Sequence, residues 1–160
     1  MTAPGTTVDA RGARWGRTVL RASLVFLAFG GVYGGIAMLA DPSGGSLGMD
    51  TVLPSLPVSD YVLPGLFLLT AMGVLPLVLA YGLWAGRRAP ATVRLGRFGT
   101  WHWAWLGSVA LGVVLVAWLL TQGLLIGFRW PIQYVTAANA AAILGAAFTA
   151  PVRRSYRAER

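Results

Sequence analysis

The residues of this chain that could perform acid–base or metal chemistry are few. Its 160 residues include five carboxylates, a single histidine, His102, and no cysteine. The absence of cysteine excludes disulfides, thiol redox chemistry, iron–sulfur ligation and c-type haem attachment. The single histidine excludes bis-histidine haem within one chain, and a metal site built only from protein side chains is short of ligands. We therefore predict no catalytic set, no metal and no cofactor.

The positions of these residues argue against several membrane activities. All five carboxylates lie outside the apolar stretches, whereas a proton-coupled multidrug exporter needs one inside them. Serine hydrolysis needs a base near an activated serine. His102 and the serine-rich segment 41–60 are expected on opposite sides of the membrane. A lipid-modifying enzyme could recruit only Asp41, Asp50 or Asp60.

Polar side chains inside the apolar stretches form the main candidate site. At the helical rise of about 1.5 Å per residue, four of them lie roughly 9–14 Å below the same membrane face. An unpaired amide in hydrocarbon is costly, so Gln122 and Asn139 should face inward and bond each other or the nearby hydroxyls. Two interpretations stay open, namely interhelical hydrogen bonding and a small outward-facing pocket. The pocket would be lined by Tyr33, Thr70, Trp118, Gln122 and Asn139.

Charged residues are expected at the mouth of this pocket. Arg129 is the one arginine predicted on the outer side, together with Asp41 and Asp60. It could pair with either aspartate and hold the outer loop, or it could bind an anionic headgroup or ligand. We favour the ion pair.

The elements that position these residues are apolar helices. The chain is 56% hydrophobic and 11% charged, with a mean hydropathy of +0.66, whereas a soluble domain carries about a quarter charged residues. A soluble globular enzyme is therefore ruled out. Four uncharged stretches are each long enough to cross a bilayer, and we expect an all-α membrane protein, an antiparallel bundle of four transmembrane helices. The stretches are residues 22–40, 61–84, 103–128 and 132–150. The first could instead be a signal peptide, but its apolar core is long and no clear cleavage site follows.

The distribution of arginine predicts the orientation of the bundle. Twelve of the thirteen arginines precede the first stretch, lie between the second and third, or follow the fourth. By the positive-inside rule, both termini lie in the cytoplasm of a multi-pass plasma-membrane protein. Residues 1–21 form a basic, partly disordered segment, and residues 151–160 form a basic tail. These short clusters beside apolar spans indicate contact with anionic lipid headgroups rather than nucleic acid.

The connections and small residues complete the predicted bundle. Segment 41–60 is rich in turn formers yet apolar, so we expect it to cover the outer mouth, with a short helical turn. The short link 129–131 implies a tight helical hairpin, while 85–100 reads as a plain basic link. The glycines of 30–35 predict close helix packing within the bundle, or a homodimer. Pro76 predicts a kink.

Several motifs resemble those of a group of small four-helix bacterial membrane proteins, common in actinobacteria and without an assigned activity. They span residues 22–151 and include DPSG at 41–44, LGM at 47–49, PGLFL at 64–68 and YGLW at 81–84. The resemblance implies topology rather than chemistry. We expect a non-enzymatic accessory or structural subunit, with a membrane-protein partner, or a small lipophilic-ligand binder. The alternative is a small transporter or membrane enzyme that uses the outer pocket.

Overall fold

The computed structural model describes residues 5–85, 92–94 and 100–157, and apart from one short hairpin its elements are helical. Helix α1 comes first, and a segment with two 3-10 turns follows it. Helices α2 and α3 join through a π-helical stretch, η3, into one rod, residues 62–85. The elements are α1 Gly5–Ala40, η1 Gly45–Leu47, η2 Leu53–Ser55, α2 Val62–Phe67, η3 Leu68–Val74, α3 Leu75–Ala85, β1 Thr92–Arg94, β2 Thr100–His102, α4 Trp103–Ile126, α5 Pro131–Phe148 and α6 Ala150–Ser155.

Three helices are long and apolar enough to span a membrane. They are residues 11–40, 62–85 and 103–126, and they agree with the first three predicted spans. The predicted fourth span forms α5, an 18-residue helix in which alanine largely replaces leucine. The expected helical class is therefore confirmed, and three of the four predicted spans are candidate membrane-spanning helices, whereas α5 is not among them.

The N-terminal region differs from the prediction. Residues 1–21 were predicted to be a basic, partly disordered segment, whereas the described residues from Gly5 onward belong to α1. Contact with helix α6 accounts for the packing of this part of α1. A Cβ atom at Gly16 would lie 2.4 Å from Cγ2 of Val152, so the two helices are in close contact. Leu20 and Val152 are completely buried. The segment expected as a basic tail thus begins as a packed helix.

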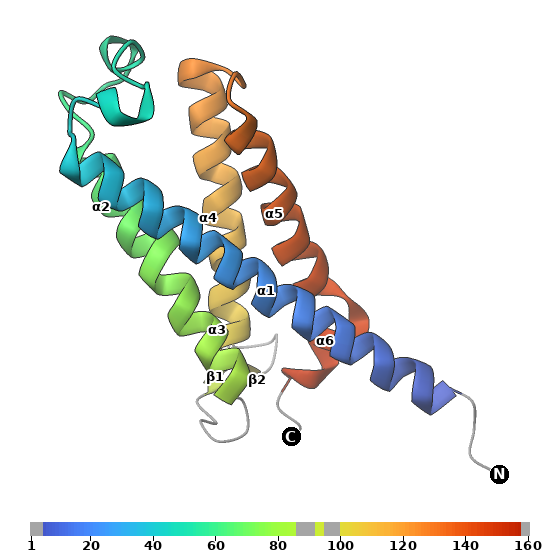
Figure 1. The fold of residues 1–160 in the computed structure, drawn as a ribbon. Helices are drawn as coiled ribbons and strands as arrows, with labels where there is room; N and C mark the ends of the chain where they lie inside the picture. Colours follow the sequence, from blue (N-terminus) through green and yellow to red (C-terminus); the bar gives the residue numbers. More distant parts are fainter. Residues whose placement is uncertain (1–4, 86–91, 95–99, 158–160) are drawn as a thin grey trace.

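Helix α1 crosses the bundle diagonally and contacts α2, η3, α3, α5 and α6 (Figure 1). Its glycines make the closest approach. A Cβ atom at Gly31 would lie 2.3 Å from the carbonyl of Met72, and one at Gly35 would lie 2.7 Å from the Leu69 nitrogen. Packing of these glycines within the bundle is therefore confirmed. A Cβ atom at Gly30 would meet nothing within 4 Å, so that side of α1 is open.

The rod is irregular just before Pro76, where the sequence predicts a kink, because residues 68–74 form the π-helical stretch η3. Proline cannot donate a hydrogen bond to the carbonyl four residues earlier, and π-helical turns are one of the ways in which a helix accommodates such a defect. The π-helical stretch ends at Val74, two residues before Pro76. Its Met72 and Gly73 form the surface against which Gly31 packs.

The two ends of the bundle are built differently (Figure 1). We call the end that carries segment 41–60 and the α4–α5 connection the loop end. The opposite end, which carries the hairpin and α6, is the terminal end. Side chains with no exposed surface concentrate toward the terminal end and include Leu20, Leu24, Ile143 and Val152. The core therefore lies off centre.

A short antiparallel hairpin precedes α4 at the terminal end. Strands β1 and β2 pair with Val93 opposite Trp101, and Trp101 also forms a bridge with Arg157. The sequence was read here as a plain basic link, so this hairpin was missed. Of the arginines assigned to the cytoplasmic side, Arg87, Arg88, Arg97 and Arg160 lie outside the described residues.

Candidate functional site

Hydrogen bonds between distant elements connect the helices toward the terminal end. Arg21 Nη2 in α1 donates to the Leu83 carbonyl at 2.7 Å, and the Tyr156 hydroxyl donates to the same oxygen at 3.4 Å. Trp105 Nε1 in α4 donates to the Ala147 carbonyl in α5 at 3.1 Å. These bonds join α1 and the chain after α6 to α3, and α4 to α5.

Asn139 forms the bond between α5 and α1 that lies nearest the loop end. Its Nδ2 donates to the Ser23 carbonyl at 3.1 Å, and both residues are buried. Asn139 was expected to bond Gln122 or a hydroxyl, and that pairing is wrong. A main-chain carbonyl in α1 is its partner instead.

Side-chain hydrogen bonds at the loop end stay within one local segment. Gln133 Oε1 accepts from the Arg129 and Trp130 N–H groups, and its Nε2 donates to the Gly127 carbonyl at 3.1 Å. Tyr61 donates to the Met49 carbonyl at 2.9 Å. Among the described residues, no side-chain hydrogen bond at this end joins α1 or segment 41–60 to the α4–α5 hairpin.

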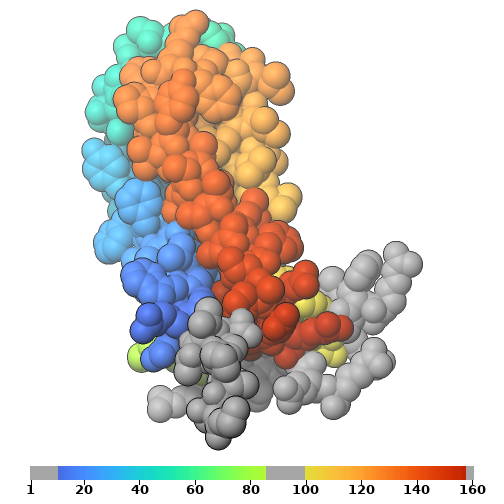
Figure 2. Space-filling view, turned by 90° about the vertical axis from the view of Figure 1, so that its right-hand side faces the viewer, coloured from blue at the N-terminus to red at the C-terminus, as the bar shows by residue number. Residues whose placement is uncertain are grey.

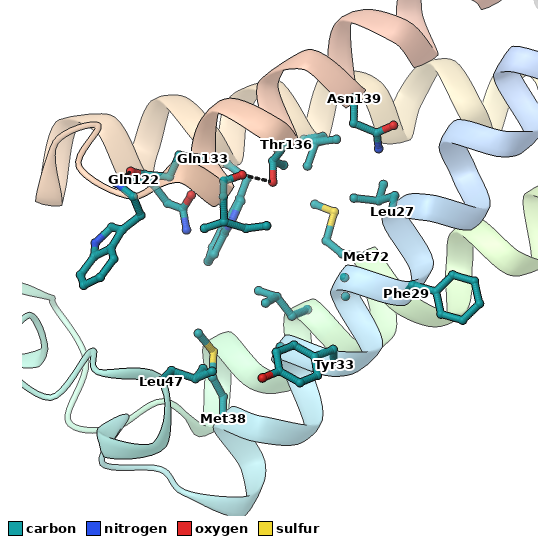
Figure 3. Close-up of a pocket in the computed structure, with 18 of the residues that line it drawn as sticks. Leu27, Phe29, Tyr33, Met38, Leu47, Met72, Gln122, Gln133, Thr136 and Asn139 are labelled. Carbon is teal, nitrogen blue, oxygen red and sulfur yellow. Dashed lines mark hydrogen bonds between the residues drawn. The ribbon is translucent and has the colours of Figure 1, made fainter.

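A cavity of about 490 Å³ lies where these connections are missing (Figure 3). Helix α1 forms one wall, α4 and α5 form another, and segment 41–60 contributes Leu47 and Met49. The apolar residues of segment 41–60 that predicted a folded loop are all half-buried. The lining comprises Phe26, Leu27, Phe29, Gly30, Gly31, Tyr33, Gly34, Met38, Leu47, Met49, Leu68, Met72, Leu115, Trp118, Gln122, Ile126, Trp130, Ile132, Gln133, Thr136 and Asn139.

The cavity opens sideways between α1 and α5. Phe29, Tyr33 and Ile132 line it and are 73%, 72% and 63% exposed. Figure 2 shows this face, with the upper part of α1 in light blue beside α5 in orange. On the other side, the rings of Phe67 and Trp118 meet with centroids 4.7 Å apart and join α2 to α4. The exposed aromatic side chains therefore border an opening in the side of the bundle.

The lining carries no charged side chain among the described residues. Several of its polar groups already have partners. Gln133 bonds the α4–α5 turn, Thr136 donates to the Ile132 carbonyl at 2.7 Å, and the Asn139 amide donates to Ser23. Gln122 is different, since its half-buried amide makes no hydrogen bond within the part of the chain that the structure describes.

The cavity contains four of the five predicted pocket residues. Tyr33, Trp118, Gln122 and Asn139 line it, although Tyr33 lies at its exposed rim. The fifth, Thr70, is not part of the lining. It is exposed and donates to the Leu66 carbonyl of its own helix at 2.6 Å. The helical rise gives the depth of Thr70 in the membrane but not the face of the helix on which it lies.

The charged residues predicted at the mouth do not join the two sides. Arg129 is exposed, and among the described residues it forms no ion pair with Asp41 or Asp60. The Asp41 carboxylate accepts bonds from the Ser43 hydroxyl and the Ser46 N–H instead. The Ser43 hydroxyl is the main cause that holds the pKa of Asp41 below its ordinary value. Asp60 accepts from the Val62 N–H at the start of α2. The favoured ion pair is therefore wrong.

Gln133 and Thr136 are lining residues that the sequence analysis did not select. Gln133 is 3% exposed and fixes the turn before α5. A glutamine three residues after a helix start is a known sign of such a turn, so this role could have been found. Thr136 sits one turn further along the same face of α5.

His102 is buried at the terminal end, away from the cavity. Its Nδ1 accepts from the Ala104 N–H at 3.3 Å and so caps α4. Its Nε2 has no partner among the described residues. No group of three or more histidine, aspartate or glutamate side chains in the described part of the chain could hold a metal ion.

In comparisons with family models, curated proteins and solved structures, nothing matches this chain. The resemblance stated above therefore stays a prediction. The cavity at the loop end is the feature from which a function can be argued.

Proposed function

We propose that the chain is a four-span plasma-membrane protein with both termini in the cytoplasm. Helix α5 would be the fourth span, since it runs back along α4 after a short turn and is buried along one face. The terminal end carries Arg14, Arg17, Arg153 and Arg154, and the loop end carries Asp41, Asp50 and Asp60. This division of charge supports a cytoplasmic terminal end.

A reporter fusion tests the orientation. A reporter fused after Arg160 should be active only in its cytoplasmic form, and a second fusion within segment 41–60 should be active only in its external form. External activity after Arg160 would contradict the orientation.

We also propose that the protein is a non-enzymatic binder of a lipophilic ligand. The observation that carries this proposal is the uncharged cavity at the loop end, open sideways between α1 and α5. Ligand sites are typically cavities of about 300–1,000 Å³ with mostly apolar walls and a few polar groups. An opening in the side of a membrane bundle faces lipid, so a lipid-soluble molecule can enter without crossing water.

Two glycines provide a matched pair of variants to test this function. A Cβ atom at Gly30 or at Gly145 would meet nothing within 4 Å, but only Gly30 lines the cavity. Gly30→Leu should place a side chain in the cavity and displace a ligand that co-purifies in mild detergent, as measured by mass spectrometry of extracted lipids. Gly145→Leu, on the outer face of α5, should leave the ligand in place.

Two results would contradict the proposed function. One is the absence of any lipid enriched over the detergent-extracted membrane. The other is an enriched lipid that Gly30→Leu and Gly145→Leu reduce to the same extent, since that lipid would bind the outer surface rather than the cavity.

A further inference from the structure

The geometry points to one class of ligand, a neutral single-chain lipid whose polar end is a hydroxyl group held by Gln122. The inference rests on the proposed lipophilic-ligand function and goes further by naming the chemistry that the cavity selects. It also gives the ligand a direction, with the hydroxyl toward the loop end and the chain toward the middle of the bundle.

Gln122 supplies the polar contact. Its amide carries both a donor and an acceptor, and it has no hydrogen bond within the described residues. Figure 3 shows its side chain among the residues around the cavity, on the α4 side. A hydroxyl group is likewise a donor and an acceptor, so it can bond both amide atoms. Polar groups surrounded by hydrocarbon are costly unless bonded, so Gln122 favours a ligand that bonds it.

The other two lining amides each use at least one of their groups in a hydrogen bond within the protein. Gln133 uses both its oxygen and its nitrogen on the turn before α5. Asn139 uses its nitrogen on Ser23. Gln122 is thus the lining amide that has both of its groups available, which places the polar end of the ligand one turn before the end of α4.

The absence of charge in the lining excludes an ionised polar end. In the part of the chain that the structure describes, no arginine or histidine lines the cavity, and Arg129 lies outside the lining. A phosphate or carboxylate moved out of water without a partner carries a large free-energy cost. A neutral lipid avoids this cost, whereas the headgroup of an anionic phospholipid could not enter the cavity.

The apolar part of the cavity accommodates a chain. Leu27, Met72 and Leu115 line it further from the loop end than Gln122 does, and all three are buried in the bundle. Gly30 leaves room on the α1 side, because no side chain fills that position. A chain that enters between α1 and α5 can therefore lie along α1 with its far end near Met72.

Photolabelling with three matched probes tests the inference. The probes are hexadecanol, hexadecane and hexadecyl phosphate, each with a diazirine in the middle of the chain, added to the full-length protein in phosphatidylcholine nanodiscs. Labelled residues are located by peptide mass spectrometry. Hexadecanol should label cavity residues such as Leu115 and Met72, hexadecane should do so more weakly, and hexadecyl phosphate should label only the outside of the bundle.

Variants of Gln122 separate its role from a general effect on folding. Gln122→Leu should reduce cavity labelling by hexadecanol about fivefold to tenfold and leave labelling by hexadecane unchanged, which also shows that the cavity is intact. Gln122→Asn keeps an amide and should retain part of the hexadecanol labelling. Gly30→Leu should abolish cavity labelling by both probes.

The outcomes distinguish the inference from the function on which it rests. Equal labelling by hexadecanol and hexadecane, unaffected by Gln122→Leu but abolished by Gly30→Leu, would overturn the hydroxyl inference and leave the lipophilic site standing. Cavity labelling by hexadecyl phosphate would also overturn the inference. Labelling of the outer face of α5 alone, with every probe, would overturn both.

Discussion

The terminal end and the loop end of this bundle differ in how their polar groups are used. At the terminal end, Arg21, Tyr156 and Trp105 donate to carbonyl groups of other helices. At the loop end, Gln133 and Tyr61 donate to carbonyls of their own neighbourhood. Hydrogen bonds therefore hold the helices together at one end, and at the other they shape each segment separately.

This difference matters because lipid gives apolar helices little reason to associate. Between helices in a bilayer, close packing of small residues and interhelical hydrogen bonds provide the attraction. The bundle has close packing of small residues on the α1–η3 contact and interhelical hydrogen bonds toward the terminal end. The side of α1 at Gly30 has neither, and the cavity lies there. Under the proposed function, the terminal end is held by these bonds and the loop end accommodates the ligand.

The largest expected effect compares two tryptophans. Trp105 is 5% exposed, donates to the Ala147 carbonyl and stacks on Trp101. Trp105→Ala should lower the free energy of unfolding by about 3–5 kcal/mol. Trp118→Ala should lower the free energy of unfolding by less, because part of the Trp118 ring already borders the cavity. Thermal unfolding in detergent, followed by the loss of monomer in size-exclusion chromatography, measures both. Equal decreases in stability for the two variants would contradict the proposed difference in packing between the terminal end and the loop end.

A smaller effect on stability is expected from a comparison of two amides that lie at similar depths in the bundle. Asn139→Leu removes the bond to Ser23 and should cost about 1 kcal/mol, as interhelical bonds in membranes do. Gln122→Leu removes an amide that has no partner in the described structure, so the ligand-free protein should lose no stability. Denaturant unfolding of both variants measures this. A larger loss for Gln122→Leu would mean that its amide connects the helices after all.

The smallest effect concerns segment 41–60. The pKa of Asp41 is lowered by the Ser43 hydroxyl and the Ser46 N–H, so its contribution is present above the unfolded pKa of about 3.9 and is lost as the pH falls through the folded value. Amide exchange at residues 43–48 should therefore keep its protection factors between pH 7 and 5 and lose protection only below about pH 4. Asp41→Ala should remove this protection at every pH and leave global stability unchanged. Loss of protection in the wild type near pH 6 would contradict this assignment.

The sequence predicted much of the helical framework because the length of an apolar stretch depends only on consecutive residues. The start of α4 at Trp103 and the tight turn before α5 agree with the prediction. The order of α1 before residue 22 could not be predicted, because it depends on contact between Gly16 and Val152, which are far apart in the chain. The short hairpin before α4 likewise makes a bridge to a distant residue, from Trp101 to Arg157.

The candidate site was predicted in part for a similar reason. Helical rise gives the depth of a polar residue, and Gln122, Asn139 and Trp118 line one cavity as expected. Depth does not determine which group each amide bonds. Asn139 reaches a main-chain carbonyl in α1, and no pattern of side chains could reveal that acceptor. Thr70 was misplaced because the face of its helix is set by the packing of η3 against α1.

The central claim is that the cavity at the loop end holds a ligand, as proposed, while interhelical hydrogen bonds hold the terminal end together. The chain has no cysteine, so pairs of introduced cysteines can carry spin labels without interference. Tyr33→Cys with Ile132→Cys reports the α1–α5 distance at the loop end, and Val19→Cys with Phe148→Cys reports it at the terminal end, all at exposed positions. Double electron–electron resonance should give a broad loop-end distance distribution that narrows when hexadecanol is added, with a narrow terminal-end distribution that does not change. Distributions of equal width at the two ends, both unchanged by hexadecanol, would contradict the claim.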